Sequence, residues 1–174
     1  MSKSLTVDWG STKNGHAYSV GVLTSTLFHL GKNSQSAVNL YGKAGTQYLS
    51  NLYRDSNGLY KEKIIDFIGL GMRLSALEEV NSNNIIPYFN LGAIMAQTSS
   101  DISNSASRWG MELGIGADFL YFNKSNASRS EADGAFFIQF DSVHFANAVA
   151  EKIPMQPDIL NGIVPKIGFR INYN

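Results

Sequence analysis

The residues of this chain that most resemble parts of a catalytic or metal site are its three histidines and one acidic pair. His16, His29 and His144 lie far apart and fall in different segments, so they lack the short spacing of metal ligands. Glu78 and Glu79 stand side by side in a turn, where such a pair is ordinarily solvated. The chain has no cysteine, which excludes thiolate metal sites and disulfides. The sequence therefore predicts no metal site and no cofactor.

Ion pairing is a second possible chemistry, and it is indicated by charges at every second position. Between Arg108 and Phe122, one parity carries charges and glycines, while the other carries apolar residues from Trp109 to Tyr121. A β-strand sends alternate side chains to opposite faces. Glycines with charges of both signs suit the inside of a narrow closed barrel whose outer wall meets lipid. The alternation therefore predicts a membrane-spanning barrel.

The same parity divides the side chains of the whole chain into two sets. Five basic and four acidic side chains would share the lumen, so we expect them to pair and plug it, because charges without partners are costly there. We predict a lumen lined by Asp8, Lys43, Arg73, Arg108, Glu112, Asp118, Gln139, Asp141, Lys166 and Arg170. The ion-pair network is assigned to Asp8, Lys43, Arg73, Arg108, Glu112, Asp118, Asp141 and Arg170. The outer wall is assigned to Leu5, Val7, Trp9, Tyr18, Val20, Val22, Val38, Leu40, Tyr48, Ile68, Leu70, Met72, Leu74, Phe89, Leu91, Met95, Phe136, Ile138, Phe140, Ile167, Phe169, Ile171 and Tyr173.

Eight segments alternate in this way, and turn-forming clusters separate them. We predict strands at 5–11, 16–30, 37–48, 63–77, 85–98, 108–122, 135–147 and 165–174. An even number of strands places both termini at one end of an all-β, antiparallel, up-and-down barrel. Aromatic residues near strand ends favour interfacial girdles, to which we assign Trp9, Tyr53, Tyr60, Tyr88 and Trp109.

Composition limits the class of protein further. The 174 residues predict a single domain, 1–174, and 16% charged residues is a low share for a soluble chain. The formal net charge is zero, which gives no reason to expect a nucleic-acid partner. No apolar run reaches the length of a membrane-spanning helix. Because no signal peptide precedes the first strand, we expect the mature form of an exported protein.

This organisation resembles the small eight-stranded outer-membrane barrels of Gram-negative bacteria. The resemblance lies in the segment from Ile86 to Gly92 with its Pro-Tyr opening, in the run from Trp109 to Phe119, and in the alternating C-terminal segment from Ile167 to Tyr173. It implies a bacterial outer-membrane location, contact with membrane lipid and lipopolysaccharide, and a monomer. It also implies that the C-terminal strand is read by the insertion machinery. The family's final aromatic is penultimate here, because Asn174 follows Tyr173.

A narrower resemblance is to the lipid A deacylases of the PagL type. It lies in the segments from Gly15 to Gly21 and from Val143 to Ala148, and in Asn161-Gly162-Ile163. The family's His-x-Ser-Asn motif implies candidate catalytic positions here. These are His144, Ala146 and Asn147, and Ala146 stands at the position of the serine nucleophile. An alanine cannot attack an ester, and the family's acidic residue falls on Val164 or Asp158, depending on the alignment.

Several readings of this segment and of the barrel stay open. The chain is a deacylase-like scaffold without its serine, a barrel in which His144 is structural, or an enzyme that uses Ser142, which precedes the histidine and reverses the motif's order. The main expectation is a structural or surface-interaction role rather than transport, with the 149–164 loop at the cell surface. A soluble lipocalin-like carrier would show the reverse facing, with the apolar parity around a cavity.

Overall fold

The computed structural model describes residues 3–12, 15–24, 26–31, 36–54, 60–76, 85–98, 107–123, 132–145 and 162–173. Side chains are described for nearly all of these residues, and every structural statement below concerns them alone. Among them, no helix is long and apolar enough to cross a membrane. The positions of Ala146, Asn147 and Asp158 lie outside the described residues.

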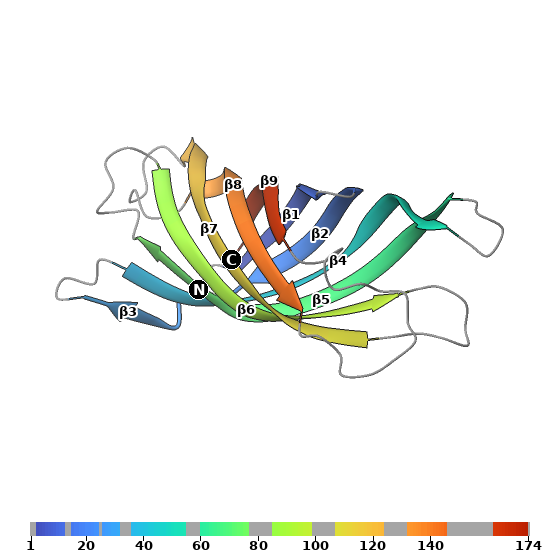
Figure 1. The fold of residues 1–174 in the computed structure, drawn as a ribbon. Coiled ribbons are helices and arrows are strands. Elements are labelled where there is room, and N and C mark those ends of the chain that lie inside the picture. The colour runs from blue at the N-terminus through green and yellow to red at the C-terminus, as the bar shows by residue number, and fades with distance from the viewer. Residues whose placement is uncertain are drawn as a thin grey trace.

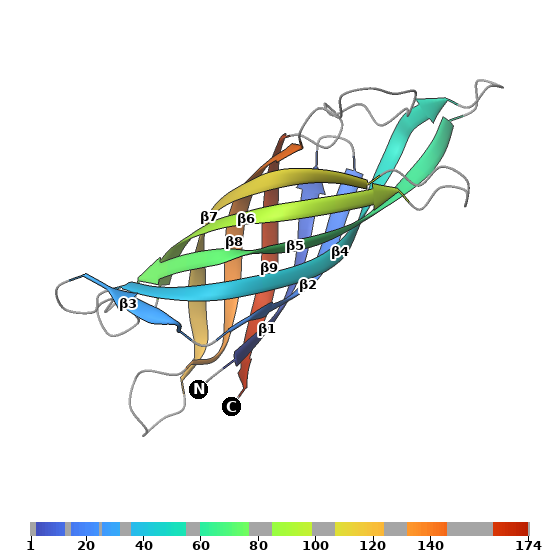
Figure 2. The same cartoon turned by 90° about the horizontal axis from the view of Figure 1, so that it is seen from below.

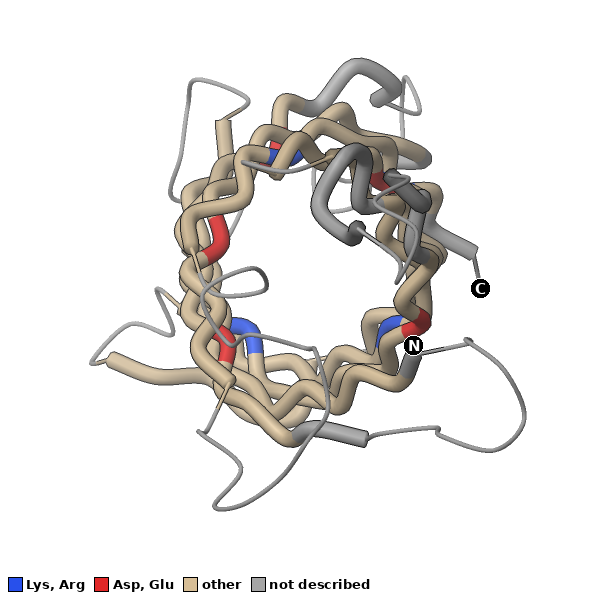
Figure 3. Tube along the Cα trace, turned by 45° about the vertical axis from the view of Figure 1, so that its right-hand side comes forward, with Lys and Arg blue, Asp and Glu red and all other residues tan. Residues whose placement is uncertain are grey.

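All described elements are β-strands of one antiparallel sheet (Figure 1). They are β1 (Lys3–Thr12), β2 (Gly15–Leu23), β3 (Phe28–Leu30), β4 (Ser36–Arg54), β5 (Tyr60–Ala76), β6 (Ile85–Thr98), β7 (Ser107–Asn123), β8 (Ala132–Phe145) and β9 (Gly162–Tyr173). Strand β9 pairs with β1, and β2 pairs with β4, so the sheet closes into a barrel (Figure 3). Because β2 and β3 both pair with the same edge of β4, they act as one strand and the barrel has eight. The predicted all-β, eight-stranded antiparallel barrel is confirmed.

The N- and C-termini lie together at one end of the barrel, as the even number of strands predicts (Figure 2). We call this the terminal end. The opposite end, where β1 ends at Thr12 and β2 begins at Gly15, is the distal end. Strands β4 and β5 extend beyond their neighbours there, and their pairing shifts register between Leu49 and Tyr53. Both strands are therefore longer than the segments predicted from the sequence.

The predicted strand 16–30 is interrupted in the structure. Between β2 and β3 the backbone leaves the regular ladder, although the amide of Thr24 still donates to the carbonyl of Leu40 and that of Leu27 to Val38. The side-chain amide of Asn39 donates to the carbonyl of Thr24 at 3.0 Å. Here a side chain takes over a backbone hydrogen bond, which the alternation of residues alone does not indicate.

The strands are staggered around the barrel. A row of paired residues that begins at Ser4 on β1 passes from strand to strand around the barrel and reaches β9 at Gly162. On β9, Lys166 pairs with Gly10 of β1, so Gly162 corresponds to a position four residues beyond Gly10, and thus ten residues beyond Ser4. One turn therefore displaces the row by ten residues toward the distal end. Such a stagger tilts the strands, and eight strands leave an interior about wide enough for side chains alone.

The facing of the side chains follows the predicted parity. On the outer wall, Leu70 is 66% exposed and Trp109 is 64% exposed, while Glu112 and Asp141 inside the barrel are almost fully buried. Two predicted positions are wrong. Val38 belongs to the outer wall by parity, but it is buried between its partners Phe28 and Leu74. Larger neighbours cover it.

The second wrong position is Tyr88, which was assigned to an interfacial girdle. Its ring is buried inside the barrel, and its hydroxyl donates to Oε1 of Gln139 at 2.9 Å. Because Phe89 faces outward, the alternation along β6 turns Tyr88 into the lumen, where Gln139 satisfies its hydroxyl. Trp9 and Trp109 face outward and are exposed, whereas the side chains of Tyr53 and Tyr60 lie outside the described part.

Candidate functional site

Near the middle of the lumen, a cluster of five charged side chains joins five strands. Lys43 on β4 bonds to Oε1 of Glu112 on β7, and its Nζ lies 3.7 Å from Oδ2 of Asp141 on β8. Lys166 on β9 binds the same Asp141 oxygen at 2.8 Å and lies 3.8 Å from Oδ1 of Asp8 on β1. Asp141 therefore receives both lysines at the centre of the cluster.

A second cluster lies nearer the terminal end. Nη2 of Arg73 is 2.5 Å from Oδ2 of Asp118, and Nη2 of Arg170 is 3.1 Å from the same oxygen. The guanidinium of Arg73 also stacks on the ring of Tyr88, with 3.5 Å between Cζ and the ring centroid. The carboxylate of Asp118 thus binds two arginines, one from β5 and one from β9. Hydrogen bonds between such oppositely charged groups are stronger than those between neutral groups.

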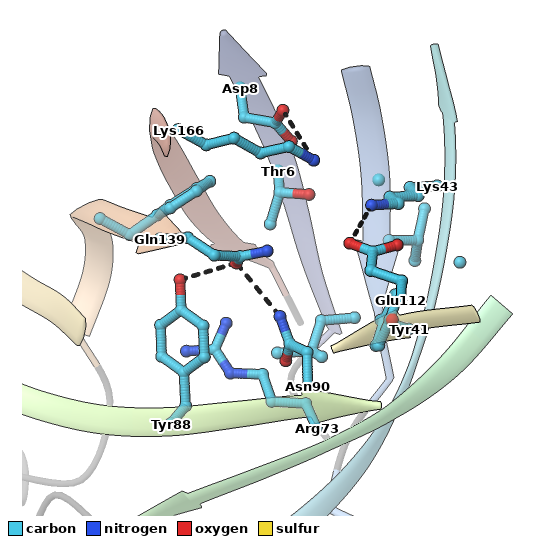
Figure 4. Close-up of a pocket in the computed structure, with 15 residues that line it drawn as sticks. Thr6, Asp8, Tyr41, Lys43, Arg73, Tyr88, Asn90, Glu112, Gln139 and Lys166 are labelled. Carbon is cyan, nitrogen blue, oxygen red and sulfur yellow. Dashed lines mark hydrogen bonds and ion pairs between the residues drawn. The ribbon is translucent and has the colours of Figure 1, made fainter. Parts of the chain in front are cut away.

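A polar cavity of about 50 Å³ lies between the two clusters (Figure 4). In it, Oε1 of Gln139 accepts hydrogen bonds from Tyr88 and from Nδ2 of Asn90 at 3.1 Å. Within the part of the chain that the structure describes, Oδ1 of Asn90, Oε2 of Glu112 and the hydroxyl of Tyr41 have no hydrogen-bond partner. Because these polar atoms can form hydrogen bonds with water, the cavity suits a few water molecules.

The distal part of the lumen is apolar. Ile65, Ile94, Ala96, Val143, Phe145 and Val164 form one buried cluster, against which Phe67 packs. A second cavity of about 30 Å³ adjoins this layer, and Lys43 and Lys166 line both cavities. The mid-lumen charges therefore separate a polar compartment from an apolar one. The sequence predicted a polar lumen throughout, so the apolar distal layer was missed.

The structure brings together seven of the eight residues assigned to the ion-pair network, in two clusters. They are Asp8, Lys43, Glu112 and Asp141 in one, and Arg73, Asp118 and Arg170 in the other. The side chain of Arg108 lies outside the described part. Lys166 belongs to the network, although it was assigned only to the lumen wall. Parity identifies a lumen residue but not its partner.

The two candidate catalytic residues that the structure describes, Ser142 and His144, lie near the distal end of β8. His144 is exposed on the outer wall, where its partner on β7 is Met111. Ser142 faces the same side, between Leu113 on β7 and Ile163 on β9, and is partly exposed. Among the described outer-wall residues, the neighbours of His144 include no carboxylate, so an acid that orients the histidine is not found there. The described residues therefore supply a base without its partners.

The other titratable outer-wall groups lie elsewhere. The ring of His16 on β2 stacks on Trp9 with 5.5 Å between centroids. Asp66 on β5 is exposed and accepts a hydrogen bond at 2.9 Å from the hydroxyl of Thr46. Asp66 was not among the residues predicted for a site. It is the one described Asp, Glu, Lys or Arg on the apolar parity, and this position in the alternation could have identified it.

Comparison with known proteins identifies the fold. No family model matches the sequence, and no curated protein matches it. The crystal structure of the outer membrane enzyme PagL superposes with a TM-score of 0.55 and 15% sequence identity, over 97% of each chain. The chain has the fold of the small eight-stranded outer-membrane barrels. The expected partial resemblance to PagL is confirmed at the level of the fold.

The facing of the side chains contradicts the soluble alternative. In a lipocalin-like carrier the apolar parity would line the cavity and the charges would meet water. Here, Val7, Val20 and Ile115 are at least half exposed on the outer wall, and the described charged residues other than Asp66 face the lumen. The arrangement is the reverse of the one that a soluble carrier requires.

Proposed function

We propose that this chain is an integral barrel of a bacterial outer membrane, with a closed lumen and a structural or surface-interaction role rather than transport. The observation that carries the proposal is charge balance in the lumen. Its eight described charges are four basic and four acidic, and each of them takes part in an ion pair. The pair of Lys43 with Glu112 and the pairs of Asp118 with both arginines cross the lumen between strands that are not neighbours in the sheet. A water-filled pore would need these side chains apart.

The dimensions of the lumen support the same proposal. The cavities of about 50 and about 30 Å³ hold at most a few water molecules, and the ion pairs of Lys43 and Lys166 separate them. The apolar layer around Ile65 and Phe145 adds a second barrier at the distal end, because a hydrophobic constriction excludes water.

Two measurements test this proposal. In a gel, protein refolded with detergent micelles is expected to migrate faster unboiled than boiled, and protein kept in plain buffer is expected to show no such form. In a planar bilayer, the inserted protein is expected to show no steady ion conductance. Folding in plain buffer would contradict the membrane location, and a steady conductance in inserted protein would contradict the closed lumen.

The partners follow from the proposed location. We expect the outer wall to contact membrane lipid and lipopolysaccharide, the protein to be a monomer, and β9 to be the strand that the insertion machinery reads. Light scattering in detergent measures the oligomeric state. Exchange of the alternating apolar residues Ile167 and Phe169 for Ser is expected to reduce insertion in cells, whereas the lumen-facing Gly168 between them does not form part of this signal.

A second candidate function is that of a PagL-like lipid A ester hydrolase scaffold. The shared fold and the exposed, outward-facing His144 near the distal end favour it. The test is mass spectrometry of lipid A incubated with the unchanged protein, with Ala146→Ser, and with Ala146→Ser combined with His144→Ala. Loss of an acyl chain only with the single variant supports the scaffold. Hydrolysis by the unchanged protein that disappears in Ser142→Ala would instead identify Ser142 as the nucleophile.

A further inference from the structure

One charged side chain breaks the division between lumen and wall. Among the side chains that the structure describes, nine belong to Asp, Glu, Lys or Arg, and eight of these lie in the lumen, where basic and acidic groups balance. The ninth, Asp66, is exposed on the outer wall. The described part of that wall carries no Lys or Arg. A carboxylate on a lipid-facing wall is costly unless it lies at the interface and meets a cation.

The stagger of the strands places Asp66 at the distal interface. Residues at the same height along the barrel axis are not paired with one another, because the strands are staggered. From one strand to the next, the residue at equal height lies slightly more than one residue away from the paired residue. Six outer-wall residues then fall within about two residues of one level. These are His16, Tyr48, Asp66, Gln97, Trp109 and His144. From there the apolar wall continues toward the terminal end for about ten residues of each tilted strand, or roughly 25 Å, the height of a membrane barrel's apolar band.

The surroundings of Asp66 suit an organic cation. Thr46 lies directly opposite and donates its hydroxyl to Oδ1 of Asp66 at 2.9 Å, which holds the carboxylate and leaves Oδ2 available. Tyr18 pairs with Thr46 on the other side, and its ring meets that of Tyr48 edge-on, with 6.2 Å between centroids. Both rings are exposed. A carboxylate beside aromatic rings is the combination that binds ammonium groups.

We propose that Tyr18, Thr46, Tyr48 and Asp66 form a headgroup site for a membrane lipid that carries an ammonium group. The ammonium group pairs with the carboxylate of Asp66 and lies against the tyrosine rings, while the acyl chains follow the apolar wall below. This site lies on β2, β4 and β5, across the barrel from His144 on β8. It rests on the proposed membrane location and is independent of any hydrolase activity.

Single tryptophans allow the site to be tested separately from the rest of the wall. Trp9 is the cross-strand partner of Tyr18, whereas Trp109 on β7 lies only two strands from Asp66, through β6. Trp109→Phe therefore leaves one reporter, beside the site, and His144→Trp in a chain that also carries Trp9→Phe and Trp109→Phe gives one reporter on β8, across the barrel from the site. Each protein is inserted in phosphatidylglycerol vesicles that contain a small fraction of lipid with brominated chains, which quench nearby tryptophan. The brominated lipid carries either an ethanolamine or a glycerol headgroup.

We expect the ethanolamine lipid to be enriched at Trp9 about threefold over the glycerol lipid, as one exposed ion pair with a cation–π contact allows. Asp66→Asn, which keeps the shape, should remove the preference, and Thr46→Val should reduce it. The reporter on β8 should show no preference. Equal quenching by both lipids at Trp9 overturns the proposal, as does a preference that survives Asp66→Asn. A preference for the glycerol lipid that requires Mg²⁺ would assign the carboxylate to a bridging metal and also overturns it. Failure of the chain to insert would count against the membrane location instead.

Discussion

Arg73 and Asp118 lie inside the barrel with Nη2 and Oδ2 2.5 Å apart, and they join β5 to β7, which are not neighbours in the sheet. The bond therefore ties together two walls that no backbone hydrogen bond connects. Arg170 on β9 binds the same oxygen. Asp118 is thus a crosslink among three strands, and its charge is neutralised by groups far from it in the sequence.

We expect Asp118→Asn to lower the free energy of unfolding by about 3–5 kcal/mol, because it removes the buried anion that Arg73 and Arg170 share. Urea unfolding of protein inserted in lipid vesicles, followed by the heat-modifiable gel shift, measures this loss. Asp66→Asn makes the same chemical change on the exposed wall and is expected to cost less than about 1 kcal/mol. Similar losses in the two variants would show that the lumen pair contributes no more than a surface contact.

Lys43 and Glu112 are expected to be strongly coupled, because both are buried and they bond to each other. Lys43→Met and Glu112→Leu should each cost about 3 kcal/mol or more, since each leaves a charge without its partner. The double variant should cost less than the two single losses together, by at least about 1.5 kcal/mol. A double-mutant cycle of unfolding free energies measures this coupling. Additive losses would mean that the two side chains act separately.

The depth of the outer wall predicts how it tolerates charge. Leu70 and Ile64 face outward on the same strand, but Leu70 lies at mid-wall and Ile64 lies beyond the distal interface. Leu70→Arg is expected to cost about 2–4 kcal/mol, and Ile64→Arg at most about 1 kcal/mol. Unfolding in vesicles compares the matched pair. Equal costs would contradict the assigned position of the bilayer.

The narrowness of the lumen makes Gly168 sensitive to substitution. A Cβ atom there would clash with the backbone carbonyl oxygen of Val7 and would lie 2.5 Å from Cζ of the buried Phe137. Gly168→Ala is therefore expected to cost about 1–3 kcal/mol through overpacking.

Gly42 on the outer wall provides the control for Gly168. There the nearest atom to an added Cβ is the end of the Leu70 side chain, at 3.2 Å, and that side chain is free to turn away. Gly42→Ala should change the unfolding free energy by less than about 0.5 kcal/mol. If Gly168→Ala is as mild as Gly42→Ala, the lumen is looser than the close approach of Phe137 indicates.

The register of the sheet explains which features the sequence could not predict. The break between β2 and β3 depends on Asn39 replacing a backbone partner of Thr24, and the partner of the buried Tyr88 hydroxyl is Gln139, two strands away. Each case joins residues that are distant in the chain. The apolar distal layer around Ile65 and Phe145 was missed for a related reason. These residues are apolar although they occupy the lumen parity, where polar side chains were expected. They form one layer because they lie at the same height in the closed barrel.

The class of fold and the facing of most side chains could be predicted from the chain alone, because a strand alternates with a period of two and this rule needs no knowledge of the neighbours. The rule places Asp8, Lys43 and Asp141 in the lumen. The closed sheet was needed to show that Asp141 receives both lysines and that Asp66 shares a level with Tyr48 and His144. Partners and depth follow from the ten-residue stagger of the closed sheet, a property of all eight strands together.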